Sequence, residues 1–133
     1  MNPLRIIIAE DHPGFRQLLR LELDCLPGLE IIAEVEDGFE LLEVLKRVQP
    51  DLVIMDISMP NLGGLETARL IKEQYCHIKV LFLTMHKNPA YVEQARLIGA
   101  EGYLLKEEVD QELLPAIDLI KKGECYISAC LAQ

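Results

Sequence analysis

The sequence contains no C-x-x-C pair, and none of its cysteines lies at zinc-ligand spacing from a histidine. The four cysteines are therefore expected to be reduced, partly buried thiols rather than metal ligands: Cys25, Cys76, Cys125 and Cys130. No apolar run approaches the length that crosses a bilayer, and the first residues lack the layout of a secretory signal. These features predict a cytoplasmic location and no membrane partner.

Basic residues are also scarce, with 13 lysines and arginines against 22 acidic residues and a net charge of −9. An acidic chain repels phosphate backbones, so this chain is not expected to bind DNA or RNA by itself. The same composition suits a cation site built from carboxylates. The length of 133 residues, half of them hydrophobic, fits one globular domain without repeats or low-complexity segments.

Short apolar runs typical of strands alternate with stretches whose apolar residues recur at helical spacing. Strands are expected at residues 4–9, 30–35, 52–55, 78–83 and 102–105, and helices at 13–26, 38–49, 65–75, 88–98 and 109–122. This alternation predicts an α/β, doubly wound parallel sheet with helices on both faces. The first, third and fourth strands are the most apolar and should be central. The flavodoxin-like order 2-1-3-4-5 satisfies this, with the second and fifth strands at the edges.

Polar residues stand where these strands end. Glu10 and Asp11 follow the first strand, Asp56 follows the third, Thr84 the fourth and Lys106 the fifth. Right-handed crossovers bring all these ends to one rim of the sheet. Each residue alone also has an ordinary explanation as a helix-dipole partner, turn residue or surface lysine. Together they predict a cluster of carboxylates that a hard cation such as Mg²⁺ would relieve of its repulsion.

This set of side chains suits phosphoryl transfer. A carboxylate such as Asp56 can attack phosphorus and form an acyl phosphate. Mg²⁺ held by Asp11 and Asp56, the Thr84 hydroxyl and the Lys106 ammonium would each neutralise one phosphoryl oxygen. The sequence offers no evident general-base histidine. His12 and His77 are expected at the surface, while His86 lies close enough to Thr84 in sequence to influence water access.

With these residues in place, the chain resembles the receiver domain of a two-component response regulator. The resemblance covers residues 4 to 122 and is specific as an ordered set rather than in any single motif. The motifs that carry it are Glu10-Asp11, Val-Ile-Met-Asp-Ile-Ser-Met-Pro around Asp56, Gly63-Gly64, Leu-Thr84 and Tyr103-Leu-Leu-Lys106.

The resemblance implies that Asp56 is the phosphoacceptor and takes phosphate from a sensor histidine kinase. It also implies a Mg²⁺ site in which Asp11 and Asp56 are direct ligands and Glu10 binds through water. The backbone carbonyl of Ser58 would be another ligand. The first helix is expected to form part of the surface on which the kinase docks.

The resemblance further implies a switch made of Thr84 and Tyr103. Thr84 would move toward the phosphoryl group, and Tyr103 would rotate inward into the space vacated. Ser58 and His86 occupy the two variable positions that tune the lifetime of the phosphoryl group in this family.

A narrower resemblance is to NarL/LuxR-type regulators, through Asp-His-Pro-Gly-Phe-Arg, Met-Pro-Asn-Leu-Gly-Gly-Leu-Glu and Gly-Glu-Cys-Tyr-Ile-Ser. It implies a receiver at residues 1–122 and the start of a linker at 123–133. A helix-turn-helix domain beyond this chain would bind DNA and control transcription. The alternatives are a stand-alone receiver acting through protein contacts and, remotely, an Asp-nucleophile phosphohydrolase.

The phosphohydrolase alternative fits poorly, because such enzymes usually carry a second acid two residues after the nucleophile and this chain has Ser58 there. We therefore expect no enzymatic turnover beyond self-phosphorylation and dephosphorylation at Asp56. In the last helix, Leu114 and Leu119 lie outside the main apolar stripe. They are either singly exposed leucines or part of a surface covered by a second subunit, as in a homodimer, or by another domain.

Overall fold

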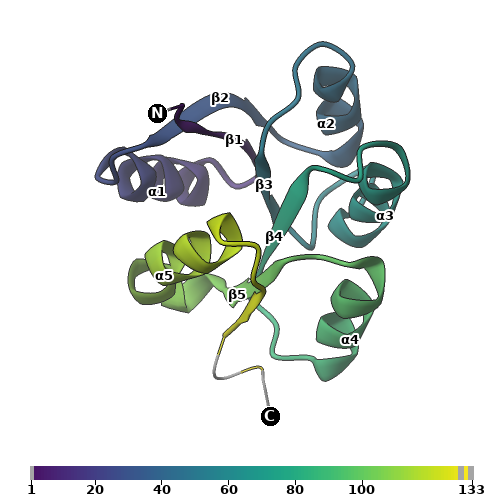
Figure 1. Cartoon of the computed structure of the whole chain (residues 1–133). Coiled ribbons are helices and arrows are strands. Elements are labelled where there is room, and N and C mark those ends of the chain that lie inside the picture. The colour runs from purple at the N-terminus through teal and green to yellow at the C-terminus, as the bar shows by residue number, and fades with distance from the viewer. Residues whose placement is uncertain (1, 129–130, 132–133) are drawn as a thin grey trace.

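A parallel sheet forms the middle layer of the structure, a computed structural model that describes residues 2–128 and 131 (Figure 1). Its strands are β1 (Leu4–Ala9), β2 (Leu29–Val35), β3 (Leu52–Asp56), β4 (Lys79–Thr84), β5 (Gly102–Leu105) and β6 (Tyr126–Ile127). They lie in the order β2-β1-β3-β4-β5-β6. The predicted fold class and the order 2-1-3-4-5 are confirmed, and β2 forms an edge as expected.

The fifth strand is not the second edge, and that prediction was wrong. β6 pairs with β5 through Gly102 opposite Tyr126 and Tyr103 opposite Ile127. A strand of two residues is too short to produce a periodic pattern, so no local pattern predicts it. β6 lies within residues 123–133, for which the sequence predicts the start of a linker.

Five helices cover the two faces of the sheet: α1 (Pro13–Asp24), α2 (Gly38–Leu45), α3 (Gly64–Gln74), α4 (Pro89–Ile98) and α5 (Val109–Lys121). α1 and α5 lie on one face, and α2, α3 and α4 lie on the other (Figure 1). A single 3₁₀ turn, η1 (Lys106–Glu108), joins β5 to α5.

Two helices are shorter than the apolar pattern predicts. α1 ends at Asp24, before Leu26, and α2 ends at Leu45, well before Pro50. After α2 the chain tightens, because the amide of Lys46 donates to the Glu43 carbonyl three residues back. Val48, counted in the predicted apolar stripe, is consequently 37% exposed.

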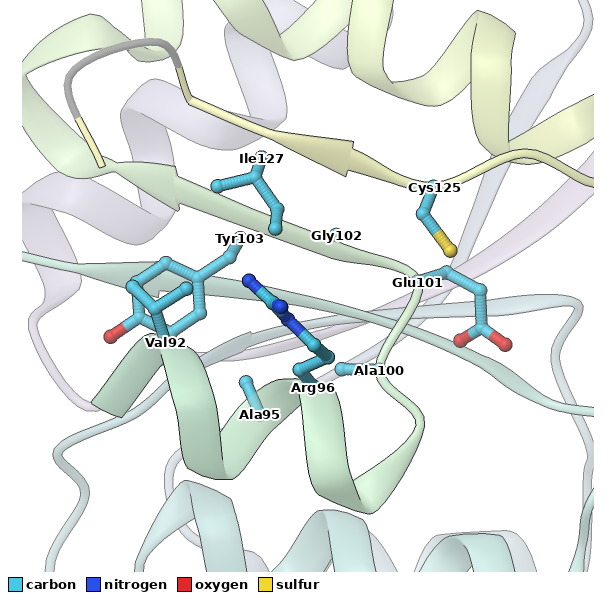
Figure 2. A pocket seen from close by; sticks show the side chains of 9 residues that line it. All are labelled: Val92, Ala95, Arg96, Ala100, Glu101, Gly102, Tyr103, Cys125 and Ile127. Carbon is cyan, nitrogen blue, oxygen red and sulfur yellow. The ribbon is translucent and has the colours of Figure 1, made fainter. Parts of the chain in front are cut away.

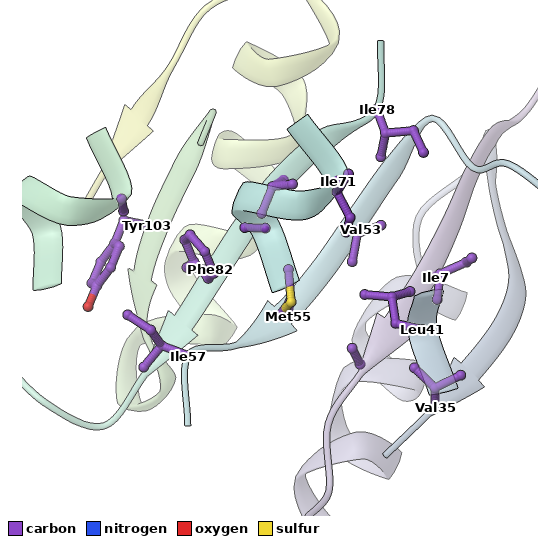
Figure 3. Close-up of a cluster of buried hydrophobic side chains, with 14 of the residues drawn as sticks. Ile7, Val35, Leu41, Val53, Met55, Ile57, Ile71, Ile78, Phe82 and Tyr103 are labelled. Atoms are coloured by element: carbon purple, nitrogen blue, oxygen red, sulfur yellow. The ribbon is translucent and has the colours of Figure 1, made fainter. Parts of the chain in front are cut away.

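The central strands are buried on both faces because helices cover both. Along β1 and β3 the side chains alternate, so that Ile7, Val53 and Met55 face α2, α3 and α4 (Figure 3). Ile6 and Ile54 face α1 and α5 instead. Full burial of such a side chain stabilises the fold by about 1.5–3 kcal/mol. These two apolar layers hold the strand ends, and hence the residues that follow them, in fixed register.

The described cysteines are free thiols, as predicted, but their predicted partial burial was wrong. Cys25, Cys76 and Cys125 are exposed, because each lies in a connection between elements rather than inside one. Cys130 falls outside the described residues. Within residues 2–128 and 131, no helix combines the length and hydropathy needed to cross a membrane.

Other surface expectations hold. His12 and His77 are exposed, as predicted. On α5, Leu114 is 46% exposed and Leu119 is half-buried. The outer side of α5 therefore presents some apolar surface.

Candidate functional site

Asp56 ends β3 and is buried, with 6% of its surface exposed. Both of its carboxylate oxygens are engaged. Oδ1 accepts a hydrogen bond from the Ser58 amide at 3.0 Å, and Oδ2 accepts one from Lys106 Nζ at 2.8 Å. The backbone therefore fixes one oxygen, while a long flexible side chain holds the other.

Glu10 and Asp11 lie beside Asp56 because β1 and β3 pair in register, with Ala9 opposite Met55. Carboxylate oxygens of the three acids lie within 4.8 Å of one another. Glu10 is fully buried, and Asp11 is exposed. The structure thus brings together the acids that the sequence places at neighbouring strand ends.

Lys106 enters this cluster from the end of β5. Its ammonium lies 2.7 Å from Glu10 Oε1 and 2.8 Å from Asp56 Oδ2, and its side chain is only 12% exposed. Burial lowers the pKa of Lys106, but the hydrogen bond to Asp56 and the ion pair with Glu10 outweigh it, so the pKa is raised overall. The lysine therefore stays charged and offsets part of the repulsion between the carboxylates.

One carboxylate oxygen of Glu10 remains available to bind a cation. Burial raises its pKa above the usual value, although the contact with Lys106 and the His12 amide act in the opposite direction. Glu10 Oε1 is buried and receives no hydrogen bond of good geometry, even though Lys106 Nζ lies close to it. An all-oxygen donor set with such an atom, next to the exposed Asp11, fits a hard divalent cation.

Thr84 ends β4 and is fully buried, but the described contacts do not join it to Asp56. Its hydroxyl oxygen accepts a hydrogen bond from the His86 amide at 3.0 Å. The predicted position at the strand end is therefore observed, whereas the hydroxyl is turned toward the loop that carries His86.

Tyr103 lies on β5 with its ring buried against Phe82, at 6.1 Å between ring centroids. Its hydroxyl is buried and receives or donates no hydrogen bond of good geometry among the described residues. Burial raises the pKa of this hydroxyl to about 12. The side chain thus occupies an inward position, as Figure 3 shows.

A cavity of about 240 Å³ adjoins Tyr103 between α4, β5 and β6 (Figure 2). The Tyr103 ring forms one wall, Val92 and Ala95 of α4 form another, and Ile127 of β6 closes a third side. The lining is almost entirely apolar. The ring therefore has free volume next to it.

Three residues that support the site were not identified from the sequence. Arg16 donates to the Glu10 carbonyl at 2.7 Å and pairs with Glu34 of β2, which ties the end of β1 to its neighbours. The ring of Phe15 lies 4.7 Å from Lys106 Nζ. Gly64 allows α3 to approach the end of β3, since a Cβ there would lie 2.4 Å from the Asp56 carbonyl oxygen. All three belong to motifs that carry the family resemblance, Asp-His-Pro-Gly-Phe-Arg and Gly63-Gly64, but no role was predicted for them individually.

The site opens to the surface through a cavity of about 820 Å³. It is lined by the acids and Lys106 and by further apolar and polar side chains: His12, Phe15, Leu18, Met85, Glu107, Val109 and Asp110. A buried, oriented carboxylate is therefore reachable by a large donor such as another protein.

Sequence comparison identifies relatives. Residues 6–118 match the family model for the response regulator receiver domain. The chain is 36% identical over 126 residues to the transcriptional regulatory protein DegU of Brevibacillus brevis, covering 95% of this chain and 53% of DegU. It is 34% identical over 133 residues to the response regulator UvrY of Escherichia coli K12, covering 98% and 60%. The chain thus spans little more than half the length of these curated relatives.

Solved structures of response regulators have the same fold as this chain. A LuxR-family response regulator from Aurantimonas superposes with a TM-score of 0.94 at 33% identity, covering 99% of this chain and 94% of that one. The isolated receiver domain of RcsB from Salmonella enterica, solved with the phosphomimetic BeF₃⁻, gives 0.93 at 27% identity, covering 98% and 97%. The chain therefore belongs to the receiver domains of two-component response regulators, and its relatives are regulators of the NarL/LuxR type.

Proposed function

We propose that Asp56 accepts a phosphoryl group from a sensor histidine kinase and that this modification switches the receiver. The observation that carries the proposal is the arrangement around Asp56. Its Oδ1 is fixed by the Ser58 amide, its Oδ2 is paired with Lys106, and two further carboxylates lie within 4.8 Å. A buried carboxylate held in this way is oriented for attack through one oxygen.

In the proposed step, an Asp56 carboxylate oxygen forms a bond to phosphorus. The bond between phosphorus and the kinase imidazole nitrogen breaks, and its electron pair returns to the ring. Lys106 leaves the carboxylate and pairs with a phosphoryl oxygen, and the Thr84 hydroxyl turns from the His86 amide to donate to another. Asp11, Asp56 and the Ser58 carbonyl would hold Mg²⁺, with Glu10 bound through water, and the ion would supply positive charge that offsets the charge of the transferred group.

The proposed switch of Thr84 and Tyr103 would follow from the movement of Thr84 toward the phosphoryl group. As Thr84 turns toward the phosphoryl group, the space it leaves becomes available to the inward Tyr103 ring, whose hydroxyl lacks a well-aligned partner. Ser58 and His86 flank the site on two loops and would tune the lifetime of the phosphoryl group through access of water. The Tyr103 ring is already buried, so the predicted inward rotation would be a shift within the core and not a movement from the surface.

The proposal is tested by incubating the protein with MgCl₂ and acetyl phosphate and measuring its intact mass. A single phosphoryl adduct is expected on the wild type and none with EDTA. Asp56→Asn should abolish the adduct, whereas Asp118→Asn, an exposed acid on α5, should leave it unchanged. An undiminished adduct in Asp56→Asn would contradict the assignment of Asp56 as the phosphoacceptor.

We further propose that the chain performs no catalytic turnover beyond self-phosphorylation and dephosphorylation at Asp56. The residue two positions after the nucleophile is Ser58, whose amide orients Asp56 but whose side chain is no general acid. Sustained hydrolysis of a phosphomonoester over many turnovers would favour a phosphohydrolase instead.

The output is proposed by analogy with the relatives. Residues 1–122 form the receiver, and residues 123–133 begin the connection to a C-terminal helix-turn-helix domain that would bind DNA. A homodimer would cover the apolar side of α5 around Leu114, and the whole protein would act in the cytoplasm. A gene encoding a further ~60–70 residues with a helix-turn-helix pattern supports this proposal. A stop codon after Gln133 supports the stand-alone receiver.

A further inference from the structure

We propose that Phe15 is a positioning residue for Lys106. Its aromatic ring holds the lysine ammonium over the phosphoacceptor while the ammonium changes partners. This inference rests on the proposed phosphorylation of Asp56.

The geometry around the ammonium supports this role. Lys106 Nζ contacts Glu10 Oε1 at 2.7 Å and Asp56 Oδ2 at 2.8 Å, and the Phe15 ring centroid lies 4.7 Å away. The side chain of Lys106 is only 12% exposed, so water has little access to the ammonium. A cation within about 6 Å of a ring centroid is attracted by the ring quadrupole, and more strongly where water is excluded.

The ring is held in place by the start of α1. The Phe15 amide donates to the His12 imidazole Nδ1 at 3.0 Å, which caps the helix. Pro13 occupies the first turn and restricts the backbone there. The ring itself is half-buried against the apolar layer beneath α1 and α5. Phe15 is therefore a fixed support rather than a mobile side chain.

Such a support matters because the partners of Lys106 change during the reaction. When Asp56 becomes an acyl phosphate, the lysine loses the carboxylate Oδ2 that it contacts. Two acids that line the same cavity, Glu107 and Asp110, are then alternative partners. An aromatic ring attracts the ammonium without competing for a hydrogen bond, so it keeps the lysine inside the site. A leucine of similar apolar character lacks this attraction.

The test compares the rate of Asp56 phosphorylation by acetyl phosphate, followed by quenching and intact mass. Phe15→Leu should slow phosphorylation roughly 3- to 10-fold, the range of a partly desolvated cation–π contact. Phe15→Tyr keeps the ring and should restore the rate to within about twofold. Phe39→Leu makes the same substitution at an exposed phenylalanine on α2 and should not change the rate.

Two further measurements separate positioning from a general loss of structure. In a Lys106→Met background, Phe15→Leu should cause no additional loss, because Phe15 acts through the lysine. In NMR spectra, the ε-methylene protons of Lys106 should show a ring-current shift that disappears in Phe15→Leu and persists in Phe15→Tyr.

Three results would overturn the inference: a wild-type rate in Phe15→Leu, an equal loss in the Lys106→Met background, or an unchanged ring-current shift. These outcomes leave the phosphoacceptor assignment intact, because that assignment is tested by Asp56→Asn alone. If Asp56→Asn retains the adduct, the proposed function fails first.

Discussion

Gly64 gives the sharpest test of how the fold holds Asp56. A Cβ at this position would lie 2.4 Å from the Asp56 carbonyl oxygen and 2.8 Å from Ile57 Cα. Both are backbone atoms, so no side chain can rotate to relieve the collision. In Gly64→Ala, α3 must move away from the end of β3, or the backbone that carries Asp56 must shift.

The expected change in the free energy of unfolding of Gly64→Ala is the balance of two opposing effects. Overpacking against fixed atoms typically costs about 1–3 kcal/mol, whereas replacing glycine by alanine in a helix gains up to about 1 kcal/mol. Gly64→Ala should therefore lower the free energy of unfolding by about 1–2 kcal/mol, or the Tm by roughly 3–8 °C in a chain of this size. Urea unfolding followed by far-UV circular dichroism measures the change.

The matched control is Gly14→Ala, at the start of α1. There the nearest atom to a new Cβ is His12 Cε1 at 3.1 Å, which a small tilt of the imidazole relieves while Nδ1 keeps its hydrogen bond from the Phe15 amide. This variant should be as stable as the wild type or slightly more so. Phosphorylation of Asp56 should also slow in Gly64→Ala, because the shift occurs at the phosphoacceptor itself. Wild-type stability and phosphorylation rate in Gly64→Ala would refute the close approach.

Two more predictions concern β5 and β6. Ser128→Ala removes a buried hydroxyl that donates to Glu112 Oε2 at 2.8 Å and should cost about 1–2 kcal/mol in urea unfolding; Tyr126→Phe removes a longer 3.3 Å contact to the same carboxylate and should cost less. Wild-type stability in Ser128→Ala would show that the hydroxyl contact to Glu112 does not anchor β6. Tyr103 has a pKa near 12 in the fold, so stability should fall as pH rises from about 10 to 12, by up to about 2.7 kcal/mol. Tyr103→Phe should lack this part of the loss, and parallel pH profiles for the two proteins would contradict it.

The acidic cluster could be predicted because it depends on topology rather than on side-chain detail. Alternating strands and helices place all strand ends on one rim, and apolar strands leave no other position for Glu10 and Asp56. Lys106 was placed by the same argument. Strand register then brings these residues within contact distance without further information from the sequence.

The remaining features depend on contacts that a local pattern does not encode. Phe15 fits the apolar stripe of α1 as well as any core residue, so its position beside Lys106 gave no signal. The Thr84 hydroxyl oxygen accepts a hydrogen bond from the His86 amide, and a position at the end of a strand does not by itself predict this partner, because a hydroxyl rotates to whichever partner is close. The β6 strand is held by long-range pairing and by Glu112, not by its own periodicity.

These contacts make β5 the common element of the site and the C-terminal segment. Lys106 directly follows β5, Tyr103 lies within it, and the Tyr103 carbonyl accepts a hydrogen bond from the Ser128 amide at 2.9 Å. Ser128 is in turn fixed to Glu112 of α5. A change in β5 on phosphorylation would therefore reach residues 126–128 through backbone hydrogen bonds, with no flexible loop between. Ser128→Ala loosens this connection without touching Asp56, so the rate of Asp56 phosphorylation should stay unchanged. Hydrogen exchange measures the protection of the backbone amide of residue 128. Any effect of phosphorylation on that protection should be weaker in Ser128→Ala than in the wild type.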